Sequence, residues 1–463
     1  MLTRTRAEQD RSCTRTLDIL HPLTPSGIPI MEKLVIRGGN PLRGTIPVSG
    51  SKNTALPLMA AALLADGPVE LAHIPDLKDI QTFSRVMGVT GARIDWSPAE
   101  NRLSIHPEGM NRAEAPYELV KRMRASFYML GALLGRMGKA KVSLPGGCAW
   151  GPRPVDLHIE GMRALGASID LDAGYVVATA PGGRLPGGSY TLHPSSVGAT
   201  INFILGAVTA SGSSVLKNAA TEPDVVVFCD MLTRMGARMS GVGTRTLEIE
   251  GVNSLSGVSF ANCPDRIELG TFMIAAAMCG VPGEPVTLTN ANADQLGRAF
   301  IQAFGQTGAA FETANGIMTV TAPDELTPVS VATDVYPGFP TDLQAQWTVL
   351  LARSNGNAKV LETIYPDRFK HIPELRRMGV NAIVVGNEVV IEGGHHIQGT
   401  SVMSTDLRAS VSLVLAGMIA DGETHVQRVY HLDRGYERLE VKLANAGIDI
   451  RRETYDEWAD PGA

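Results

Sequence analysis

The chain has 463 residues, of which 44% are hydrophobic and 19% are charged, and its formal net charge is -6. This length and composition predict a soluble globular protein with two or more domains. The acidic balance argues against sequence-independent binding of nucleic acid, which normally needs a basic face. No apolar run reaches the roughly 18 residues of a membrane span, so we also expect no membrane partner.

Residues 1–30 carry scattered arginines and three prolines but no apolar block of the kind found in secretory signals. We expect a disordered leader, with Met31 as a second candidate for the start of translation. The chain has an odd number of cysteines without paired spacing, which indicates neither a disulfide framework nor a metal site and fits a reducing cytoplasm. These cysteines are Cys13, Cys148, Cys229, Cys263 and Cys279. Cys229 and Cys279 lie in apolar helical stretches, where we expect unreactive thiols.

A helix followed by a glycine and a short strand recurs six times along the chain. The copies cover residues 55–71, 127–144, 201–216, 272–288, 344–361 and 410–426. A second helix, also closed by a glycine, runs in step with the first. Its glycines are Gly91, Gly166, Gly236, Gly308, Gly379 and Gly447. A residue in this position often adopts a left-handed conformation, which glycine reaches without steric cost.

Six units of about 70 residues account for nearly all of the chain after residue 31. One such unit cannot bury both faces of its helices, so the units must pack together, and six of them indicate two α/β domains of three units each. A linear array is the alternative. The period of about 70 residues is longer than that of the usual helical repeats.

Charged residues stand directly before the first helix in four of the six units. They are Lys52 with Asn53, Arg124, Asp342 and Arg408, and a fifth unit carries the uncharged segment 195–200 there. Helix N-termini that converge with cations suit phosphate and carboxylate groups. Each residue alone could be a cap or a surface residue, but recurrence at equivalent positions favours an anion site. Asp342 could act there as a cap or as a base.

A glycine-rich loop, residues 144–156, places Cys148 close to Arg153. A thiol near positive charge is reactive, although a small buried turn residue is the simpler alternative. Arg434 precedes a glycine and could reach a ligand, whereas we expect Arg438 and Lys442, on the next helix, to face solvent. No Gly-Lys-Ser/Thr phosphate loop and no GxGxxG after a strand is present.

Several motifs resemble those of the UDP-N-acetylglucosamine 1-carboxyvinyltransferase family, which transfers enolpyruvate in peptidoglycan precursor synthesis. The likeness runs from about residue 31 to 452. Its motifs are Ser-Gly-Ser-Lys-Asn (49–53), Met-Arg-Ala-Ser (123–126), Leu-Pro-Gly-Gly-Cys (144–148), Arg-Pro-Val-Asp-Leu-His (153–158), Ser-Val-Gly-Ala-Thr (196–200), Phe-Pro-Thr-Asp (339–342), Thr-Asp-Leu-Arg-Ala-Ser (405–410) and Asp-Arg-Gly-Tyr-Glu (433–437). The resemblance implies two α/β domains with pseudo-threefold symmetry, each an inside-out barrel, with residues 31–51 and 260–463 in one domain and 52–259 in the other.

The resemblance also implies a reaction in a cleft between the domains, without metal or cofactor. The 3-hydroxyl of UDP-N-acetylglucosamine takes the enolpyruvyl group of phosphoenolpyruvate, and phosphate leaves. Cys148 would donate a proton and react with the epoxide fosfomycin, and Asp342 would be the base. The implied phosphoenolpyruvate contacts are Lys52 and Arg408, which also count as catalytic, with Arg124, Arg153 and Arg434. The implied UDP-sugar contacts are Asn53, Arg124, Arg153, Pro154, Val155, Asp156, Leu157, Ser196, Val197, Gly198, Asp342 and Ile364.

Three positions depart from the family pattern. Many members carry lysine where this chain has Pro194, and Trp150 and Leu269 replace smaller residues. Pro194 leaves open a second hypothesis, a related transferase that acts on a bare nucleotide such as UMP. The shikimate-pathway enolpyruvyl transferase lacks the cysteine loop, and a non-enzymatic scaffold would have lost catalytic positions, so both are disfavoured. We expect small-molecule substrates and no nucleic-acid partner; the sequence does not indicate an oligomeric state.

Overall fold

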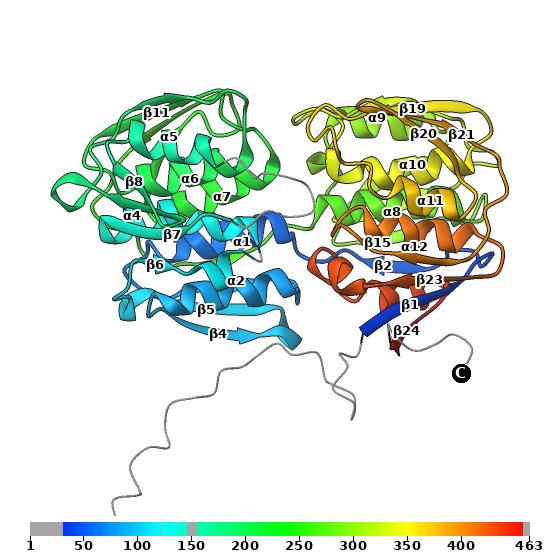
Figure 1. Cartoon of the computed structure of the whole chain (residues 1–463), viewed down its shortest axis with the longest axis horizontal. Coiled ribbons are helices and arrows are strands. Elements are labelled where there is room, and N and C mark those ends of the chain that lie inside the picture. Colours follow the sequence, from blue (N-terminus) through cyan, green and yellow to red (C-terminus); the bar gives the residue numbers. More distant parts are fainter. Residues whose placement is uncertain (1–30, 122, 146–154, 457–463) are drawn as a thin grey trace, which may run out of the picture.

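The computed structural model describes residues 31–121, 123–145 and 155–456. Two lobes lie side by side (Figure 1). We call them the inserted lobe, whose apolar core runs from Ala55 to Phe260, and the terminal lobe, whose core combines residues 34–48 with 267–450. Each lobe contains three four-stranded sheets, so the expected fold of two α/β domains with three units each is confirmed.

All six sheets share one topology. Two parallel strands lie at one side, and an antiparallel pair completes the sheet. In the inserted lobe the sheets are β14 (Ser259–Ala261), β3 (Val69–Ala72), β5 (Arg102–His106), β4 (Arg93–Ser97); β6 (Glu114–Ala115), β7 (Lys139–Ser143), β9 (Tyr175–Thr179), β8 (Ser168–Asp172); and β10 (Ser189–Thr191), β11 (Ser213–Lys217), β13 (Thr246–Glu250), β12 (Arg238–Ser240).

The sheets of the terminal lobe follow the same order. They are β16 (Ala310–Ala314), β17 (Ile317–Thr321), β15 (Val286–Thr289), β2 (Thr45–Pro47); β18 (Val331–Ala332), β19 (Asn357–Leu361), β21 (Glu388–Glu392), β20 (Asn381–Val385); and β22 (Ser401–Met403), β23 (Glu423–Gln427), β1 (Met31–Arg37), β24 (Asp449–Tyr455). Strand β1 pairs with both β23 and β24, so the beginning and the end of the described chain complete one sheet.

Three buried helices form the centre of each lobe and contact one another. They are α1 (Lys52–Ala62), α4 (Met129–Met137) and α6 (Val197–Ala207) in the inserted lobe, and α8 (Arg266–Cys279), α10 (Gln344–Arg353) and α12 (Ser410–Ile419) in the terminal lobe. Their sequences are apolar around most of the circumference, as burial on all sides requires. Small residues allow close approach: a Cβ on Gly131 would lie 2.4 Å from the carbonyl oxygen of Asn202 on α6.

The second helix of each unit packs farther out. These helices are α2 (Lys78–Val89), α5 (Asp156–Ala164), α7 (Pro223–Arg234), α9 (Arg298–Gln306), α11 (Ile372–Arg377) and α13 (Leu439–Asn445). The six glycines expected at their ends all have φ between 90° and 109°, which confirms the left-handed conformation. No helix of the described residues is long and apolar enough to cross a membrane.

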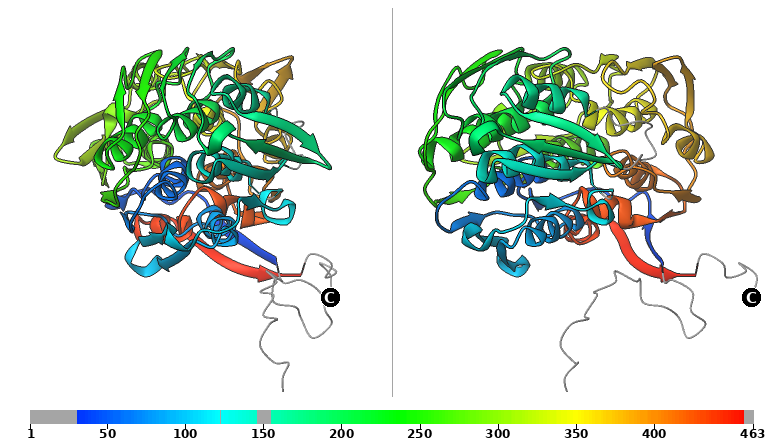
Figure 2. Two further views of the ribbon diagram at one scale, coloured as in Figure 1. Left: turned by 90° about the vertical axis from the view of Figure 1, so that its left-hand side faces the viewer. Right: turned by 60° about the vertical axis from the view of Figure 1, so that its left-hand side comes forward.

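The chain passes between the lobes twice, and the two passages exchange strands. β2 leads into α1 but pairs with β15 of the terminal lobe, and β14 leads into α8 but pairs with β3 of the inserted lobe. The two connecting segments run side by side: the Ser51 amide donates to Cys263 O at 2.7 Å, and the Asp265 amide donates to Ser49 O at 2.8 Å. The turned views of Figure 2 show that the lobes remain distinct and face each other along one side.

Candidate active site

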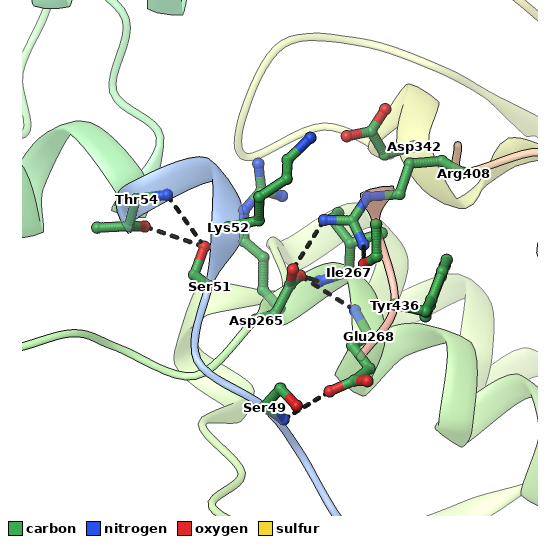
Figure 3. A network of polar contacts seen from close by, with 12 residues as sticks. Ser49, Ser51, Lys52, Thr54, Asp265, Ile267, Glu268, Asp342, Arg408 and Tyr436 are labelled. Carbon is green, nitrogen blue, oxygen red and sulfur yellow. Dashed lines mark hydrogen bonds and ion pairs between the residues drawn. The ribbon is translucent and has the colours of Figure 1, made fainter. Parts of the chain in front are cut away.

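The charged residues expected before the central helices come together between the lobes. Lys52 is the first residue of α1 in the inserted lobe, whereas Asp342 and Arg408 precede α10 and α12 in the terminal lobe. Figure 3 shows these three side chains around one region. Both Arg408 and Asp342 affect the ionisation of Lys52, so the site is assembled from both lobes.

Lys52 is almost completely buried and pairs with Asp79 of α2, with its Nζ 3.3 Å from Oδ2. Burial lowers the pKa of Lys52 below 10.5; Asp79 opposes this effect, while Arg408 and Arg434 add to it. The other oxygen of Asp79 accepts a hydrogen bond at 2.8 Å from Nε of Arg434, which lies on the 3₁₀ helix η7 (Val429–Arg434) of the terminal lobe. One carboxylate therefore joins two of the predicted cations.

Asp342 lies on the 3₁₀ helix η6 (Thr341–Leu343), and its Oδ1 is 2.7 Å from Nη1 of Arg368. Burial opposes the negative charge of Asp342, but Arg368, Arg408 and Lys52 outweigh burial and hold the pKa of this carboxyl far below its usual range. Asp342 is thus ionised at neutral pH and can accept a proton, as a general base must.

Arg408 is 1% exposed, and its guanidinium is held from several sides. It donates to Asp265 at 2.7 Å and to Gly435 O at 2.8 Å, and it lies over the ring of Tyr436. Its Nε is buried and has no hydrogen-bond partner among the described residues. Burial lowers the pKa of Arg408, but Asp265 outweighs burial and raises it, so the charge is permanent.

Arg124 begins the 3₁₀ helix η3 (Arg124–Tyr128) before α4 and reaches the terminal lobe, where Nη1 lies 3.5 Å from the hydroxyl of Tyr365. Lys52, Arg124, Arg408, Arg434 and Asp342 are therefore all contributed to the space between the lobes. Cys148, Arg153 and Pro154 lie outside the described residues, as do the loop glycines around Cys148 and Trp150.

The predicted UDP-sugar contacts occur at the starts of three helices and in one loop. Asn53 follows Lys52 on α1, Val155 to Leu157 begin α5, and Ser196 caps α6 through the Ala199 amide at 3.3 Å. The loop residue Ile364 uses its amide to donate to the buried carboxylate of Glu362 at 2.8 Å. The amide of Ile364 is thus already bonded, and only its carbonyl is left for a ligand.

Sequence reasoning missed the carboxylates and the arginine that hold the predicted residues in place. Asp79, Asp265 and Arg368 pair with Lys52, Arg408 and Asp342 across gaps of 27, 143 and 26 residues. Only Arg368 had a local signal, because it follows Tyr365-Pro-Asp in a charged cluster. Pairing over such separations has no signature in one sequence.

One expectation is wrong. Lys442 does not face solvent; its side chain is 11% exposed, and Nζ pairs with the buried Glu268 at 2.8 Å and donates to Ser49 Oγ at 2.6 Å. Arg438 is exposed as expected. A buried carboxylate on α8 draws Lys442 inward, since an unpaired charge there would be costly.

The described cysteines are not reactive thiols. Burial raises the pKa of Cys229, Cys263 and Cys279 to about 12 in each case. Cys229 is buried as expected, whereas Cys279 is partly exposed at the end of α8. Among the described residues, no group of three or more His, Cys, Asp or Glu side chains is arranged to hold a metal ion.

Comparison with known proteins agrees with this architecture. Residues 36–443 match the family model described as EPSP synthase (3-phosphoshikimate 1-carboxyvinyltransferase). The UDP-N-acetylglucosamine 1-carboxyvinyltransferase of Chloroherpeton thalassium is 50% identical over 432 residues, covering 93% of this chain and 99% of the relative. The protein of the same name from Pelodictyon phaeoclathratiforme is 48% identical over 429 residues, covering 92% and 100%.

Solved structures show the same fold. The enolpyruvyl transferase NikO from Streptomyces tendae aligns with a TM-score of 0.82 and 27% identity, over 92% of this chain and all of the other. EPSP synthase from Acinetobacter baumannii aligns with a TM-score of 0.71 at 19% identity, over 91% and 100% of the two chains. By its matched length and its identity to these relatives, the chain belongs to the UDP-N-acetylglucosamine 1-carboxyvinyltransferase family of enolpyruvyl transferases.

Proposed function

We propose that the protein transfers the enolpyruvyl group of phosphoenolpyruvate to the 3-hydroxyl of UDP-N-acetylglucosamine and releases phosphate, the reaction named for its relatives. The observation that carries the proposal is the ionised Asp342 surrounded by buried cations from both lobes. Phosphoenolpyruvate brings about three negative charges at neutral pH, and cations already fixed by the fold can neutralise them without reorganising.

The reaction proceeds by addition and elimination. The sugar oxygen bonds to C2 of phosphoenolpyruvate, Asp342 takes the hydroxyl proton, and C3 receives a proton to give a tetrahedral adduct. C3 then gives up a proton, and the C2–O bond to phosphate breaks, which restores the double bond. We assign the proton donation at C3 to Cys148.

The phosphoenolpyruvate anion is assigned to Lys52, Arg124, Arg153, Arg408 and Arg434. The buried Nε of Arg408, unpartnered among the described residues, supports this assignment, because an unsatisfied buried donor is costly until a ligand accepts from it. The nucleotide sugar is assigned to the helix starts at Asn53, Val155–Leu157 and Ser196–Gly198, together with Arg124, Arg153, Pro154, Asp342 and Ile364.

In the cell we place this activity in the cytoplasm, as the first step of peptidoglycan precursor synthesis, without metal or cofactor. It would serve cell-wall biogenesis and thereby cell shape and division. Fosfomycin would inhibit it by alkylating Cys148.

Phosphate release from phosphoenolpyruvate tests the function, with UDP-N-acetylglucosamine and UMP compared as acceptors. We expect turnover only with the sugar nucleotide, and Asp342→Asn should abolish it. Equal or faster turnover with UMP would replace the proposal by the nucleotide-specific alternative. No phosphate release with either acceptor would refute enolpyruvyl transfer.

A further inference from the structure

Asp79 occupies an unusual position for a residue with no assigned role. It lies in the first turn of α2, its side chain is 5% exposed, and its two carboxylate oxygens serve different lobes. Oδ2 pairs with Lys52 of the same lobe at 3.3 Å, and Oδ1 accepts from Nε of Arg434 of the terminal lobe at 2.8 Å. Both partners belong to the cations that we assign to phosphoenolpyruvate.

The surrounding contacts form an interdomain clasp, which we define as Asp76, Lys78, Asp79 and Asn101 of the inserted lobe together with Asp433, Arg434 and Glu437 of the terminal lobe. Glu437 accepts from the Asp76 amide at 2.7 Å and from the Asn101 side chain at 3.0 Å. Lys78 lies 3.7 Å from Asp433 in a largely exposed pair. Asp79 and Arg434 form the buried part of this clasp, where the loss of one charge costs most.

The other carboxylates near Lys52 are differently engaged. Asp342 pairs with Arg368, and Asp265 pairs with Arg408 and caps α8. Asp79 is therefore the carboxylate that meets Lys52 at ion-pair distance among the described pairs. Two flexible cations of like charge stay oriented toward one space only while an anion lies between them.

We propose that Asp79 is a positioning residue that holds Lys52 and Arg434 in register across the two lobes, so that phosphoenolpyruvate meets an assembled pair of cations. The inference rests on the proposed function and extends it to a residue that does not touch the reacting atoms. Asp79 thereby couples the docking of the η7 loop to the binding of this substrate.

Asp79→Asn tests the proposal, because it keeps the shape of the side chain and removes the charge. We expect the KM for phosphoenolpyruvate to rise about tenfold or more, since truncating a buried charge pair is costly, while the KM for UDP-N-acetylglucosamine changes less than twofold. Asp79→Glu should recover part of the loss. Lys78→Gln, in the exposed pair of the same clasp, is the control and should leave both KM values within twofold.

Small-angle X-ray scattering of the substrate-free protein gives a second readout that does not depend on turnover. We expect a larger radius of gyration for Asp79→Asn than for the wild type or Lys78→Gln, because the buried contact between the lobes is lost. An unchanged or lower KM for phosphoenolpyruvate, or equal changes in both KM values, would overturn the positioning role. If the wild type released no phosphate, the proposed function would fail, but an unchanged radius of gyration would still refute the clasp separately.

Discussion

Removing Arg368 should destabilise the protein and shift the ionisation of Asp342. Arg368→Met deletes the cation 2.7 Å from Asp342 and 3.8 Å from the buried Asp406. Breaking a buried ion pair costs about 3–5 kcal/mol; because the Asp342 side chain is 28% exposed, water recovers part of this, and we expect about 2–4 kcal/mol. For a lobe of this size that corresponds to a fall in melting temperature of roughly 5–15 °C.

The pH dependence gives the sign. The pKa of Asp342 is depressed in the folded state, first against burial and then by Arg368, so the stabilisation is complete above the unfolded pKa of about 3.9 and is lost as the pH falls below it. The variant should therefore lose most of its stability deficit near pH 3. In the variant the acid limb of kcat/KM should also move to higher pH, since the base is protonated more easily.

Calorimetry and urea unfolding measure the stability, and a double-mutant cycle with Asp342→Asn isolates the pair. The control is Arg377→Met, which removes an arginine of the same lobe that is 59% exposed and pairs with Glu374; we expect at most about 1 kcal/mol there. Equal losses for Arg368→Met and Arg377→Met, or a coupling energy near zero, would refute the reasoning.

Three further outcomes follow from the described residues. Burial lowers the pKa of Lys52 below 10.5, so if its charge binds substrate, the alkaline limb of kcat/KM should lie below pH 10.5; a limb above that value would contradict the role. Iodoacetamide at pH 7.5 should label Cys148 first, which peptide mass spectrometry can check, because a thiol of pKa about 12 is ionised to only about 10⁻⁵–10⁻⁴. Thiols of this kind are Cys229, Cys263 and Cys279. Lys442→Met should cost about 1–3 kcal/mol in urea unfolding, because it leaves the carboxylate of Glu268 buried without its cation, whereas Arg438→Met should change stability by less than about 0.5 kcal/mol; similar values for both would show that Lys442 is not held in the interior.

The repeats carried most of the fold in the sequence, because each copy repeats the same local requirements. An apolar helix, a glycine with positive φ such as Gly91 and a short strand are all readable within one window. The exchange of β2 and β14 between the lobes was not readable, because both strands are three residues long and pair with partners far away in the chain.

The charged residues of the site divide along the same line. Lys52, Arg124, Asp342 and Arg408 were identified because each stands at the start of a repeated helix, which is a local position. Asp79 and Asp265 were not, since only the assembled lobes bring them within reach of Lys52 and Arg408. The solvated look of Lys442 misled for this reason as well: its partner Glu268 lies 174 residues away.

The place where the chain changes lobes is also the place where the site begins. Ser51 caps α1 directly before Lys52, and Asp265 caps α8 while its other oxygen holds Arg408. The connecting segments that carry these two caps are hydrogen-bonded to each other, and Gly50 is packed so closely that a Cβ there would lie 1.7 Å from the carbonyl oxygen of His73. A rotation of one lobe against the other must turn about these segments, so it necessarily changes the distance between Lys52 and Arg408. Closure of the lobes and assembly of the cation pair are therefore one movement, set by the same few residues.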